Sequence, residues 1–221
     1  MFKEHNFIIW GDYCKCGIEC SILQNQQHPW DNTDLIVKLK CNVCGDEVVI
    51  NKEKAERFYN NKIYSFFKDV QGNIIDLGCG GGFLSRYLLN NDNINKIVGL
   101  DIDSESISEL QDIILNPRFK FINTDICNLQ EIFTKDSMDY LVSRDVFMFV
   151  EDTDKYFDDV TSIVTKGIKQ MGWYIEDNKR IKNKLLPEQI LEEYTKRGWK
   201  AELEHLDWYK SGYFVNAYKG I

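Results

Sequence analysis

The sequence of 221 residues has no long apolar run, only three prolines, and no stretch rich in glycine and serine. A membrane-spanning helix needs roughly 18 consecutive apolar residues, and no run approaches that length. Lys3, Glu4 and His5 interrupt the apolar residues at the start of the chain, so the start does not have the pattern of a signal peptide. We therefore expect a cytoplasmic protein with no membrane partner and no low-complexity linker.

Basic residues are in deficit, with 27 Lys and Arg against 35 Asp and Glu, which gives a formal net charge of −8. Such a charge repels phosphate backbones and disfavours a non-specific nucleic-acid binder. The composition, 43% hydrophobic and 28% charged, is that of a globular protein. The length allows one large domain, or one domain and a small module.

The seven cysteines are distributed unevenly, because five of them lie within the first 44 residues. Their number is odd and no export signal accompanies them, so thiols that bind a metal are favoured over a disulfide framework. Cys79 and Cys127 lie far downstream, and we expect them to be small buried residues rather than reactive thiols.

The early cysteines predict a zinc-ribbon-like module over residues 1–50, with three short strand-like runs at 7–10, 34–40 and 47–50. Two thiolates three positions apart and followed by glycine, as at 41–45, form the usual zinc knuckle, and 14–17 is a shorter version. A segment of this length buries too little core to fold alone, so Zn²⁺ would be structural. If the cysteines at 14 and 16 are too close in sequence to occupy two positions of the tetrahedral zinc site, Cys20 or His28 would replace one of them as a ligand. The preferred ligands are Cys14, Cys16, Cys41 and Cys44.

From residue 51 onward, a helix is predicted first, and apolar strand-like runs then alternate with amphipathic helical stretches. Two final strand-like runs lie close enough together to form a hairpin. This order predicts an α/β domain over 51–221 with a doubly wound, mostly parallel, seven-stranded sheet and an antiparallel edge. The predicted strands are 73–77, 96–101, 119–122, 138–142, 172–175, 199–206 and 212–218.

A glycine-rich turn, 78–82, follows the first of these strands and precedes a helix that begins at Phe83. Glycine lets a backbone turn tightly against a ligand, and the start of the helix offers unpaired N–H groups. Asp101 closes the second strand, where a carboxylate can accept hydrogen bonds from both ribose hydroxyls. Asp125 follows the third strand, where it could accept a hydrogen bond from an adenine amino group.

The residues around the turn argue against a dinucleotide site. Such a site has a third glycine at the position that Phe83 occupies here, and the carboxylate of Asp76 would repel a pyrophosphate. The same carboxylate would attract a cation, such as the α-amino group of a bound methionine. An NAD-dependent oxidoreductase is therefore disfavoured.

Five motifs together resemble the class I S-adenosylmethionine-dependent methyltransferases, whose fold is Rossmann-like, over about 51–219. They are IIDLGCGGG at 74–82, VGLDID at 98–103, NTDI at 123–126, MDYLVSRDV at 138–146, and LPEQIL at 186–191 leading to KRGW at 196–199.

The resemblance implies a role for each candidate cofactor residue. Gly78 and Gly80 would line the methionine portion of S-adenosylmethionine, beside Asp76, and Asp101 would hold the ribose. Ile102 would pack on the adenine, and Asp125 with the Ile126 backbone would bind the adenine amino group. Ser143 and Arg144 would face the departing methyl group.

One departure from the family concerns the acceptor side. Many small-molecule members have Glu-His where this chain has Met148 and Phe149, so we expect an apolar acceptor face. In-line displacement of a sulfonium methyl depends mainly on positioning, and an acceptor that is already nucleophilic needs little proton transfer. The catalytic residues are therefore unknown from the sequence, with Asp145, Arg144 and His205 as candidates.

We expect an S-adenosylmethionine-dependent methyltransferase with a small-molecule acceptor. The segment 176–185 is too short for a large substrate cap, and the acidic balance argues against a long RNA footprint. One alternative is an RNA or protein acceptor, with the zinc module as the docking element. Another is a non-catalytic cofactor-binding regulator or scaffold, which the residues at 148 and 149 suggest.

Overall fold

The computed structural model describes residues 2–3, 19–25, 37–41, 47–50, 52–174, 181–206, 209 and 211–220. The chain divides into two compact units, Met1–Ser65 with Trp208–Lys210, and Phe66–Asp207 with Ser211–Ile221. The division falls inside one helix, whereas the sequence places the domain boundary at residue 50. None of the helices in the described part is long and apolar enough to cross a membrane.

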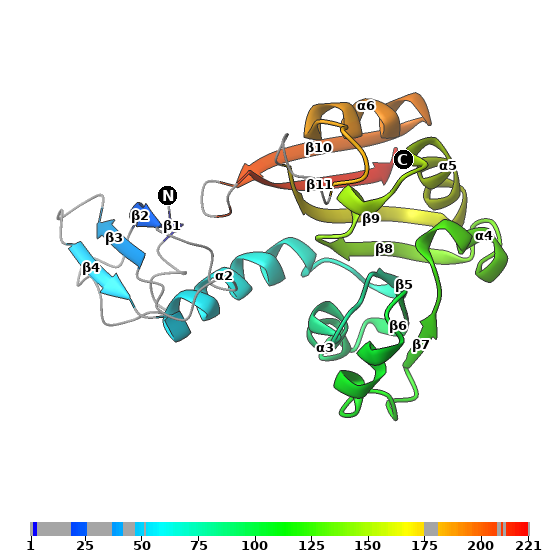
Figure 1. Cartoon of the computed structure of the whole chain (residues 1–221), viewed down its shortest axis with the longest axis horizontal. Helices are drawn as coiled ribbons and strands as arrows, with labels where there is room; N and C mark the ends of the chain where they lie inside the picture. Colours follow the sequence, from blue (N-terminus) through cyan, green and yellow to red (C-terminus); the bar gives the residue numbers. More distant parts are fainter. Residues whose placement is uncertain are drawn as a thin grey trace. The chain divides into compact units, whose positions relative to one another are not determined.

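The described residues of the first unit contain an antiparallel sheet in the order β1-β2-β3-β4 (Figure 1). Its strands are β1 (Phe2–Lys3), β2 (Glu19–Asn25), β3 (Val37–Cys41) and β4 (Glu47–Ile50), and the helix α2 (Lys52–Phe67) follows. Strands β3 and β4 and the helix confirm the predictions for these segments. The strand predicted at 7–10 lies outside the described residues, and β2 was not predicted. The register of β2 and β3 places the backbones of Cys20 and Cys41 directly opposite each other.

The second unit contains, among the described residues, a seven-stranded sheet in the order β10-β11-β9-β8-β5-β6-β7. Five neighbouring strands, from β9 to β7, pair in parallel, and β10 and β11 form the antiparallel edge. This arrangement confirms the predicted doubly wound sheet. The position of the fifth strand was wrong, because β9 spans Val164–Trp173 whereas the prediction is 172–175. The strands are β5 (Gly72–Leu77), β6 (Ile94–Asp101), β7 (Phe119–Asn123), β8 (Met138–Arg144), β9 (Val164–Trp173), β10 (Trp199–Leu206) and β11 (Gly212–Lys219).

Both faces of this sheet are covered, as the continuous apolar runs of its central strands require. On one face, Ile75 and Leu77 pack in a core with Phe157 and Tyr194 from two helices, α5 (Thr153–Ile163) and α6 (Pro187–Lys196). The intervening residue Asp76 points to the other face, where it contacts α3 (Phe83–Leu89). Figure 1 shows α5 and α6 beside the β9 to β10 side of the sheet and α3 beside β5 and β6.

Several helical elements between the strands are short, and one of them is shorter than predicted. The stretch 104–115, predicted as a helix, forms the 3-10 helix η1 (Ser104–Leu110) followed by turns. Its start is fixed by Asp103, whose side chain accepts a hydrogen bond from the Glu105 N–H. The other short elements are α4 (Leu129–Ile132) and the 3-10 helices η2 (Ile126–Asn128) and η3 (Phe147–Phe149).

The last two residues of α2, Phe66 and Phe67, belong to the second unit, and Phe66 makes two contacts there. The Phe66 ring stacks on Phe214 with 4.1 Å between ring centroids. The ammonium group of Lys169 donates a hydrogen bond of 2.7 Å to the Phe66 carbonyl. A cation at the carbonyl end of a helix is favoured by the helix dipole, and this contact also satisfies one terminal carbonyl.

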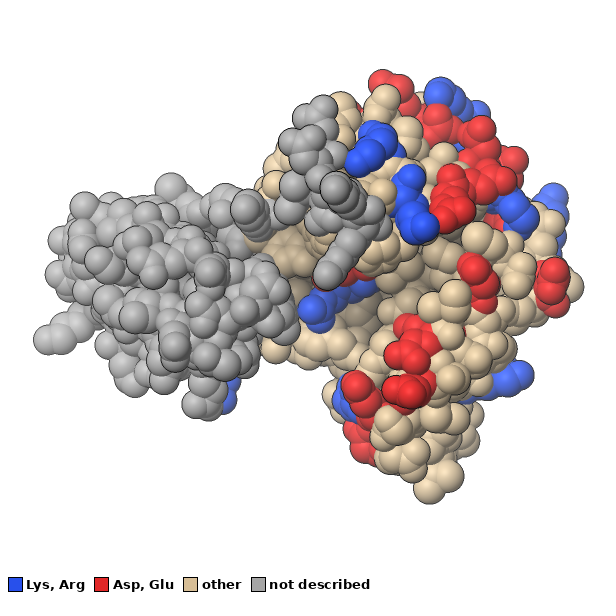
Figure 2. All heavy atoms as spheres, viewed as in Figure 1, with Lys and Arg blue, Asp and Glu red and all other residues tan. Residues whose placement is uncertain are grey.

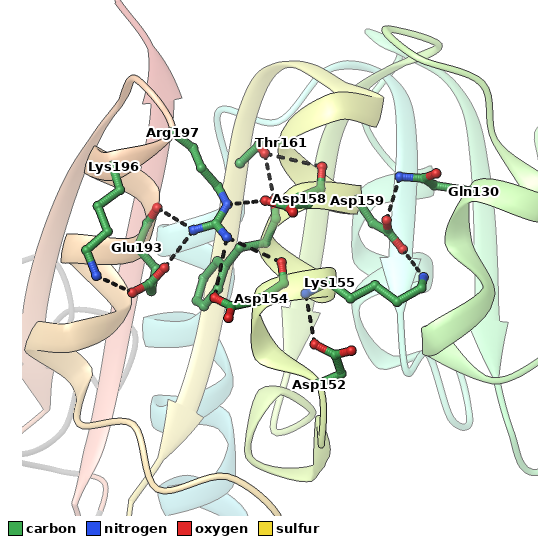
Figure 3. A network of polar contacts seen from close by, with 11 residues as sticks. Gln130, Asp152, Asp154, Lys155, Asp158, Asp159, Thr161, Glu193, Lys196 and Arg197 are labelled. Atoms are coloured by element: carbon green, nitrogen blue, oxygen red, sulfur yellow. Dashed lines mark hydrogen bonds and ion pairs between the residues drawn. The ribbon is translucent and has the colours of Figure 1, made fainter.

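Helices α5 and α6 are joined by one arginine at the end of α6 (Figure 3). The Arg197 guanidinium lies 2.6 Å from an oxygen of Asp158 on α5 and 2.6 Å from an oxygen of Glu193 on α6, with Asp154 at 3.6 Å. The Arg197 side chain is 18% exposed and that of Glu193 is 16% exposed, so this pair is less screened than the pairs with the exposed Asp154 and Asp158. Figure 2 shows acidic side chains gathered over this part of the unit, and Arg197 offsets their mutual repulsion.

Candidate functional site

The glycine-rich turn between β5 and α3 depends on left-handed backbone conformations. Gly78, Gly80 and Gly82 have φ angles of 66°, 46° and 81°, which favour glycine. A Cβ at Gly78 would lie 2.2 Å from Cγ2 of Val146, which follows β8. A Cβ at Gly80 would meet no heavy atom of the described part within 4 Å. The turn therefore packs closely against the β8 end on one side and is open at Gly80.

Asp76 lies directly under this turn with an exposed fraction of 1%. One of its carboxylate oxygens accepts a hydrogen bond of 2.6 Å from the Ser85 hydroxyl on α3. Burial raises the pKa of Asp76 to about 6, although the Ser85 hydrogen bond and the charge of Arg144 act in the opposite direction. The backbone N–H of Ser85 also donates to Asp76, yet burial outweighs both hydrogen bonds, and a bound cation would relieve the cost of the buried charge.

Asp101 connects the turn to the end of β6. One carboxylate oxygen accepts a hydrogen bond of 2.7 Å from the Gly80 N–H, and the other accepts one of 2.9 Å from the Asp103 N–H. Each carboxylate oxygen has a second acceptor position, which can still receive a hydroxyl. The next residue, Ile102, is 71% exposed and presents an apolar side chain beside this carboxylate.

Asp125 follows the neighbouring strand β7 and caps η2, because its Oδ1 accepts a hydrogen bond of 2.9 Å from the Cys127 N–H. Ile126, the first residue of η2, is partly buried. Asp76, Asp101 and Asp125 thus lie at the carboxyl ends of β5, β6 and β7, which are consecutive in the sheet. The helix-capping role is a structural function that Asp125 has in addition to any ligand contact.

A cavity of about 250 Å³ opens between the turn and the end of β8. The Arg144 guanidinium carbon lies 4.3 Å from the centroid of the Phe83 ring, and Arg144 Nε lies 3.4 Å from an oxygen of Asp145. Asp145 has a φ angle of 59°, which is uncommon for a residue other than glycine and turns the chain sharply after β8. The cavity is lined by Asp76, Gly78, Cys79, Gly80, Gly81, Phe83, Leu84, Arg144 and Asp145.

Four residues that the sequence analysis considered are not among those that line this cavity, namely Ser143, His205, Met148 and Phe149. Ser143 precedes Arg144 in β8, so strand alternation directs it to the opposite face, where it is 1% exposed. His205 is on the surface at β10, with Nε2 2.9 Å from a Glu188 oxygen. Met148 is buried in the unit, whereas Phe149 is 45% exposed. Of the proposed catalytic candidates, the structure therefore brings together Arg144 and Asp145.

The sequence analysis missed a tyrosine near the end of β8. Tyr213, at the start of β11, crosses β9 so closely that a Cβ at Gly172 would lie 2.6 Å from the tyrosine hydroxyl. Burial raises the pKa of Tyr213, and the nearby charges of Tyr156 and Asp145 raise it further. A glycine inside a strand, at 172, was the available signal of such a close approach. Ser85, the partner of Asp76, carried no such signal.

The two downstream cysteines differ from each other. Cys79 is buried as predicted, and burial raises the pKa of its thiol, which opposes thiolate formation. Cys127 is exposed, so the prediction that it is buried is wrong. The reason is its position in η2, a short surface element between β7 and α4. Partial desolvation and the adjacent Asp125 still raise the pKa of the Cys127 thiol.

The proposed zinc ligands fall mostly outside the described residues, namely Cys14, Cys16 and Cys44, together with the substitute His28. Cys20 and Cys41 lie on the paired strands β2 and β3. Within the described part of the chain, no group of three or more His, Cys, Asp or Glu residues could hold a metal ion.

The fold and the glycine turn define a Rossmann-like methyltransferase. A family model described as "Methyltransferase domain" matches residues 68–210, which is more than half of the chain. The protein therefore belongs to the methyltransferase domain family. A search of curated proteins found no match.

Solved structures show the same fold at low sequence identity. A chain from the complex of the Haloferax volcanii Trm112 methyltransferase activator with a putative methyltransferase has a TM-score of 0.62 and 16% identity, covering 76% of this chain and 92% of that one. A putative S-adenosylmethionine-dependent methyltransferase from Listeria monocytogenes has a TM-score of 0.58 and 13% identity, and the match covers 76% of this chain and 100% of that one. Haemonchus contortus phosphoethanolamine N-methyltransferase 2, in complex with S-adenosylmethionine, has a TM-score of 0.61 and 17% identity. That match covers 73% of this chain and 52% of the other chain.

The burial of Asp76 predicts a conflict between stability and ligand binding. The rise in pKa from 3.8 to about 6 corresponds to a desolvation cost of about 3 kcal/mol as an upper figure. Asp76→Asn should therefore raise the Tm of the ligand-free protein well above pH 6, while its amide oxygen still accepts from Ser85. Because the folded state binds the proton more tightly, wild-type stability rises as pH falls from 6 towards 3.8. The advantage of the variant should shrink over that interval.

Thermal unfolding of both proteins across this pH range measures the effect, with the exposed Asp92→Asn as the control. A Tm for Asp76→Asn below that of the wild type well above pH 6 would contradict the desolvation argument.

Proposed function

We propose that the chain binds S-adenosylmethionine at the cavity beside the glycine turn and transfers its methyl group to a small-molecule acceptor. The observation that carries the proposal is the hydrogen bond from the Gly80 N–H to Asp101, because it joins the glycine turn and the expected ribose carboxylate into one unit. The exposed Ile102 beside Asp101 supplies an apolar surface for adenine.

The residues present fit the cofactor in charge and in shape. The buried Asp76 carboxylate would accept the cationic α-amino group, and the open side of Gly80 would admit the methionine chain. Asp101 would accept hydrogen bonds from the ribose hydroxyls at its remaining acceptor positions. Asp125 and the Ile126 backbone, at the end of the next strand, would contact the adenine amino group.

The bound cofactor supplies an electrophilic methyl group on a sulfonium. In an in-line displacement, the acceptor atom forms a bond to the methyl carbon as the carbon–sulfur bond breaks, so catalysis depends on alignment. Arg144 is held over Phe83, and Asp145 lies beside it at the cavity, so these residues would orient the acceptor. Tyr213 would place a hydroxyl near Asp145, and Asp145 is the candidate group to receive a proton from an acceptor that must lose one.

Two features favour a small acceptor. The cavity of about 250 Å³ beside the glycine turn is small, and the acidic surface would repel a long phosphate backbone. The Haemonchus contortus enzyme, a phosphoethanolamine N-methyltransferase by its printed name, shares the fold. The alternative is an RNA or protein acceptor, with the first unit as the docking element. The Haloferax volcanii complex, which contains a methyltransferase activator, is the comparison that favours a protein partner.

Changing Asp101 to Ala should raise the dissociation constant for S-adenosylmethionine by about tenfold or more, because hydrogen bonds to a charged group are lost. Titration calorimetry measures the change. Since Ala also releases the Gly80 N–H, Asp101→Asn should have a smaller effect, because its amide oxygen remains an acceptor.

The matched control is Asp103→Ala, which removes a cap of η1 two residues away and should leave the dissociation constant nearly unchanged. Equal effects of the Asp101 and Asp103 changes would reject the ribose role. Binding of NADH by the wild type, without binding of S-adenosylmethionine, would reject the cofactor itself.

The acceptor class can be identified with labelled cofactor. Incubation with cell extract, followed by separation into metabolite, RNA and protein fractions, should place the label in the metabolite fraction. An Asp145→Asn variant is the comparison, because it removes the charge at the cavity. Label in RNA or protein would support the alternative acceptors. Cofactor binding without label in any fraction would instead favour a non-catalytic regulator or scaffold.

We also propose that the first unit is a zinc-ribbon-like module that binds a structural Zn²⁺ ion. Cys41 lies at the end of β3, in the first knuckle position, and the backbone of Cys20 is directly opposite it. The backbone register places these two positions on neighbouring strands of one sheet, as two ligands of one metal ion require. This register supports Cys20 as the substitute ligand beside the preferred set of Cys14, Cys16, Cys41 and Cys44.

Protein purified without chelator should contain about one equivalent of zinc per chain, as a closed four-thiolate site requires. Cys41→Ser should lose the metal, whereas the downstream control Cys127→Ser should retain it. Separate Cys16→Ser and Cys20→Ser variants then identify the fourth ligand by which of them loses zinc. Metal analysis that finds no zinc in the wild type would overturn the module.

A further inference from the structure

A second cavity, of about 380 Å³, opens at the amino ends of four neighbouring strands of the seven-stranded sheet. Asn73 of β5, Lys96 of β6, Lys120 of β7 and Met138 of β8 line it, together with residues of the segment 132–137. The glycine turn and its cavity lie at the carboxyl ends of these strands, and the two cavities share no lining residue. The second cavity is therefore separate from the candidate cofactor site.

The strand register directs the polar side chains of this cavity to one face of the sheet. Asn73 and Lys96 are partners in β5 and β6, and Lys120 is the partner of Val98, two positions beyond Lys96. Register partners in neighbouring parallel strands point to the same face, and so do residues two apart in one strand. Because Val98 belongs to the core with α5 and α6, the cavity opens on that face.

The cavity exists because the connection between β7 and β8 contains little helix. In a parallel sheet, the connections between strands normally cover its faces with helices. Here the connection forms only η2, of three residues, and α4, of four residues. Leu129 and Phe133 from this segment reach the core, but the space over the first residues of β6 and β7 stays open.

The lining combines charged and apolar side chains in a regular order. In both β6 and β7, a lysine stands two positions before an apolar residue that lines the same cavity, Lys96 before Val98 and Lys120 before Ile122. The two lysines are exposed, whereas Val98 is only 4% exposed. The ammonium groups therefore lie towards solvent and the apolar groups lie deeper, an order that fits a ligand with an anionic end and an apolar end.

The ammonium groups of Lys96 and Lys120 are not neutralised by the protein. Asp139, on the adjoining strand β8, forms an ion pair of 2.8 Å with Lys166 and accepts a hydrogen bond of 2.8 Å from the Asn73 N–H. Within the part of the chain that the structure describes, neither Lys96 nor Lys120 forms an ion pair or a side-chain hydrogen bond. Two positive charges in one cavity are thus available to an anion.

We propose that this cavity binds a small organic phosphate, namely a phosphate monoester of an apolar or aromatic group. A phosphate monoester carries a charge of about −1.5 to −2 at pH 7, which two lysines match better than they match a carboxylate. The hydroxyls of Thr134 and Ser137, which also line the cavity, can donate to its oxygens. Small-molecule sites usually have volumes of about 300 to 1,000 Å³, and this cavity lies within that range.

Phenyl phosphate is a suitable probe, because it has both the charged and the apolar end. An NMR titration of the backbone amides should show saturable shifts at Lys96, Lys120 and Thr134, and none at Gly80. Inorganic phosphate and phenol each lack one end, so each should bind about fivefold more weakly or less. Equal affinity for inorganic phosphate or for phenol would overturn the proposal, as would the absence of saturable shifts at the cavity.

Substitution of the lysines tests the charged half of the site. Lys96→Gln and Lys120→Gln should each raise the dissociation constant for phenyl phosphate about three- to fivefold, and the double variant about tenfold or more. Because both side chains are exposed, the Tm of each variant should stay close to that of the wild type.

The matched control is Lys200→Gln, which removes the same charge from an exposed lysine on β10, away from the cavity. It should leave the dissociation constant for phenyl phosphate nearly unchanged. Equal weakening by the control and by the cavity variants would show non-specific attraction to the protein surface and would overturn the site. The titration needs no S-adenosylmethionine, so its result is independent of the proposed methyl transfer.

Discussion

The hydrogen bond between the Gly80 N–H and the Asp101 carboxylate is the contact on which the site depends. It joins the turn after β5 to the end of β6, and the same turn packs at Gly78 against Val146 after β8. Three neighbouring strand ends are thereby fixed relative to one another by a few contacts of main chain and side chain. The cavity, the carboxylate of Asp76 and the exposed Ile102 all take their positions from this junction.

Much of the sheet unit could be predicted from the sequence, because its strands are apolar runs separated by turns and helices of ordinary length. The prediction was less accurate where polar residues interrupt an element. Lys166, Lys169 and Gln170 interrupt the apolar pattern of β9, so the sequence indicated only the end of this strand. The stretch that begins with Ser104 has helical periodicity, yet it forms a 3-10 helix and turns. Asp103 fixes only the first turn, and the apolar positions Ile107 and Leu115 remain exposed, so packing does not extend the helix.

The candidate site was predictable to the extent that it follows from strand ends. Asp76, Asp101 and Asp125 occupy them as the pattern indicates. Ser143 illustrates a limit of family resemblance, because side chains in a strand alternate and Ser143 and Arg144 cannot face the same cavity. Tyr213 illustrates another, since it reaches the β8 end from a strand that is distant in sequence. Zinc binding stays a prediction, because most of its cysteines lie outside the described residues.

Asp76 and Gln170 show two ways in which polar groups are kept inside this unit. Asp76 has the hydroxyl and the backbone N–H of Ser85 as partners, and burial still raises its pKa, an arrangement that suits a binding site more than a stable core. Gln170 is neutral, and its amide oxygen accepts a hydrogen bond from the Tyr194 hydroxyl. The two side chains lie on opposite faces of the central strands, so the charged group is on the face of the candidate site and the neutral group is on the other.

Gly172, in the paired strands β9 and β11, is a position at which a substitution would disturb the packing of Tyr213. Gly172 carries no functional group, yet the Tyr213 ring occupies the space that a side chain at this position would fill. Even the smallest substitution would push an aromatic ring towards the β8 end. Among natural variants of this protein, we therefore expect a larger residue at position 172 to occur together with a smaller residue at position 213, so that the two positions covary.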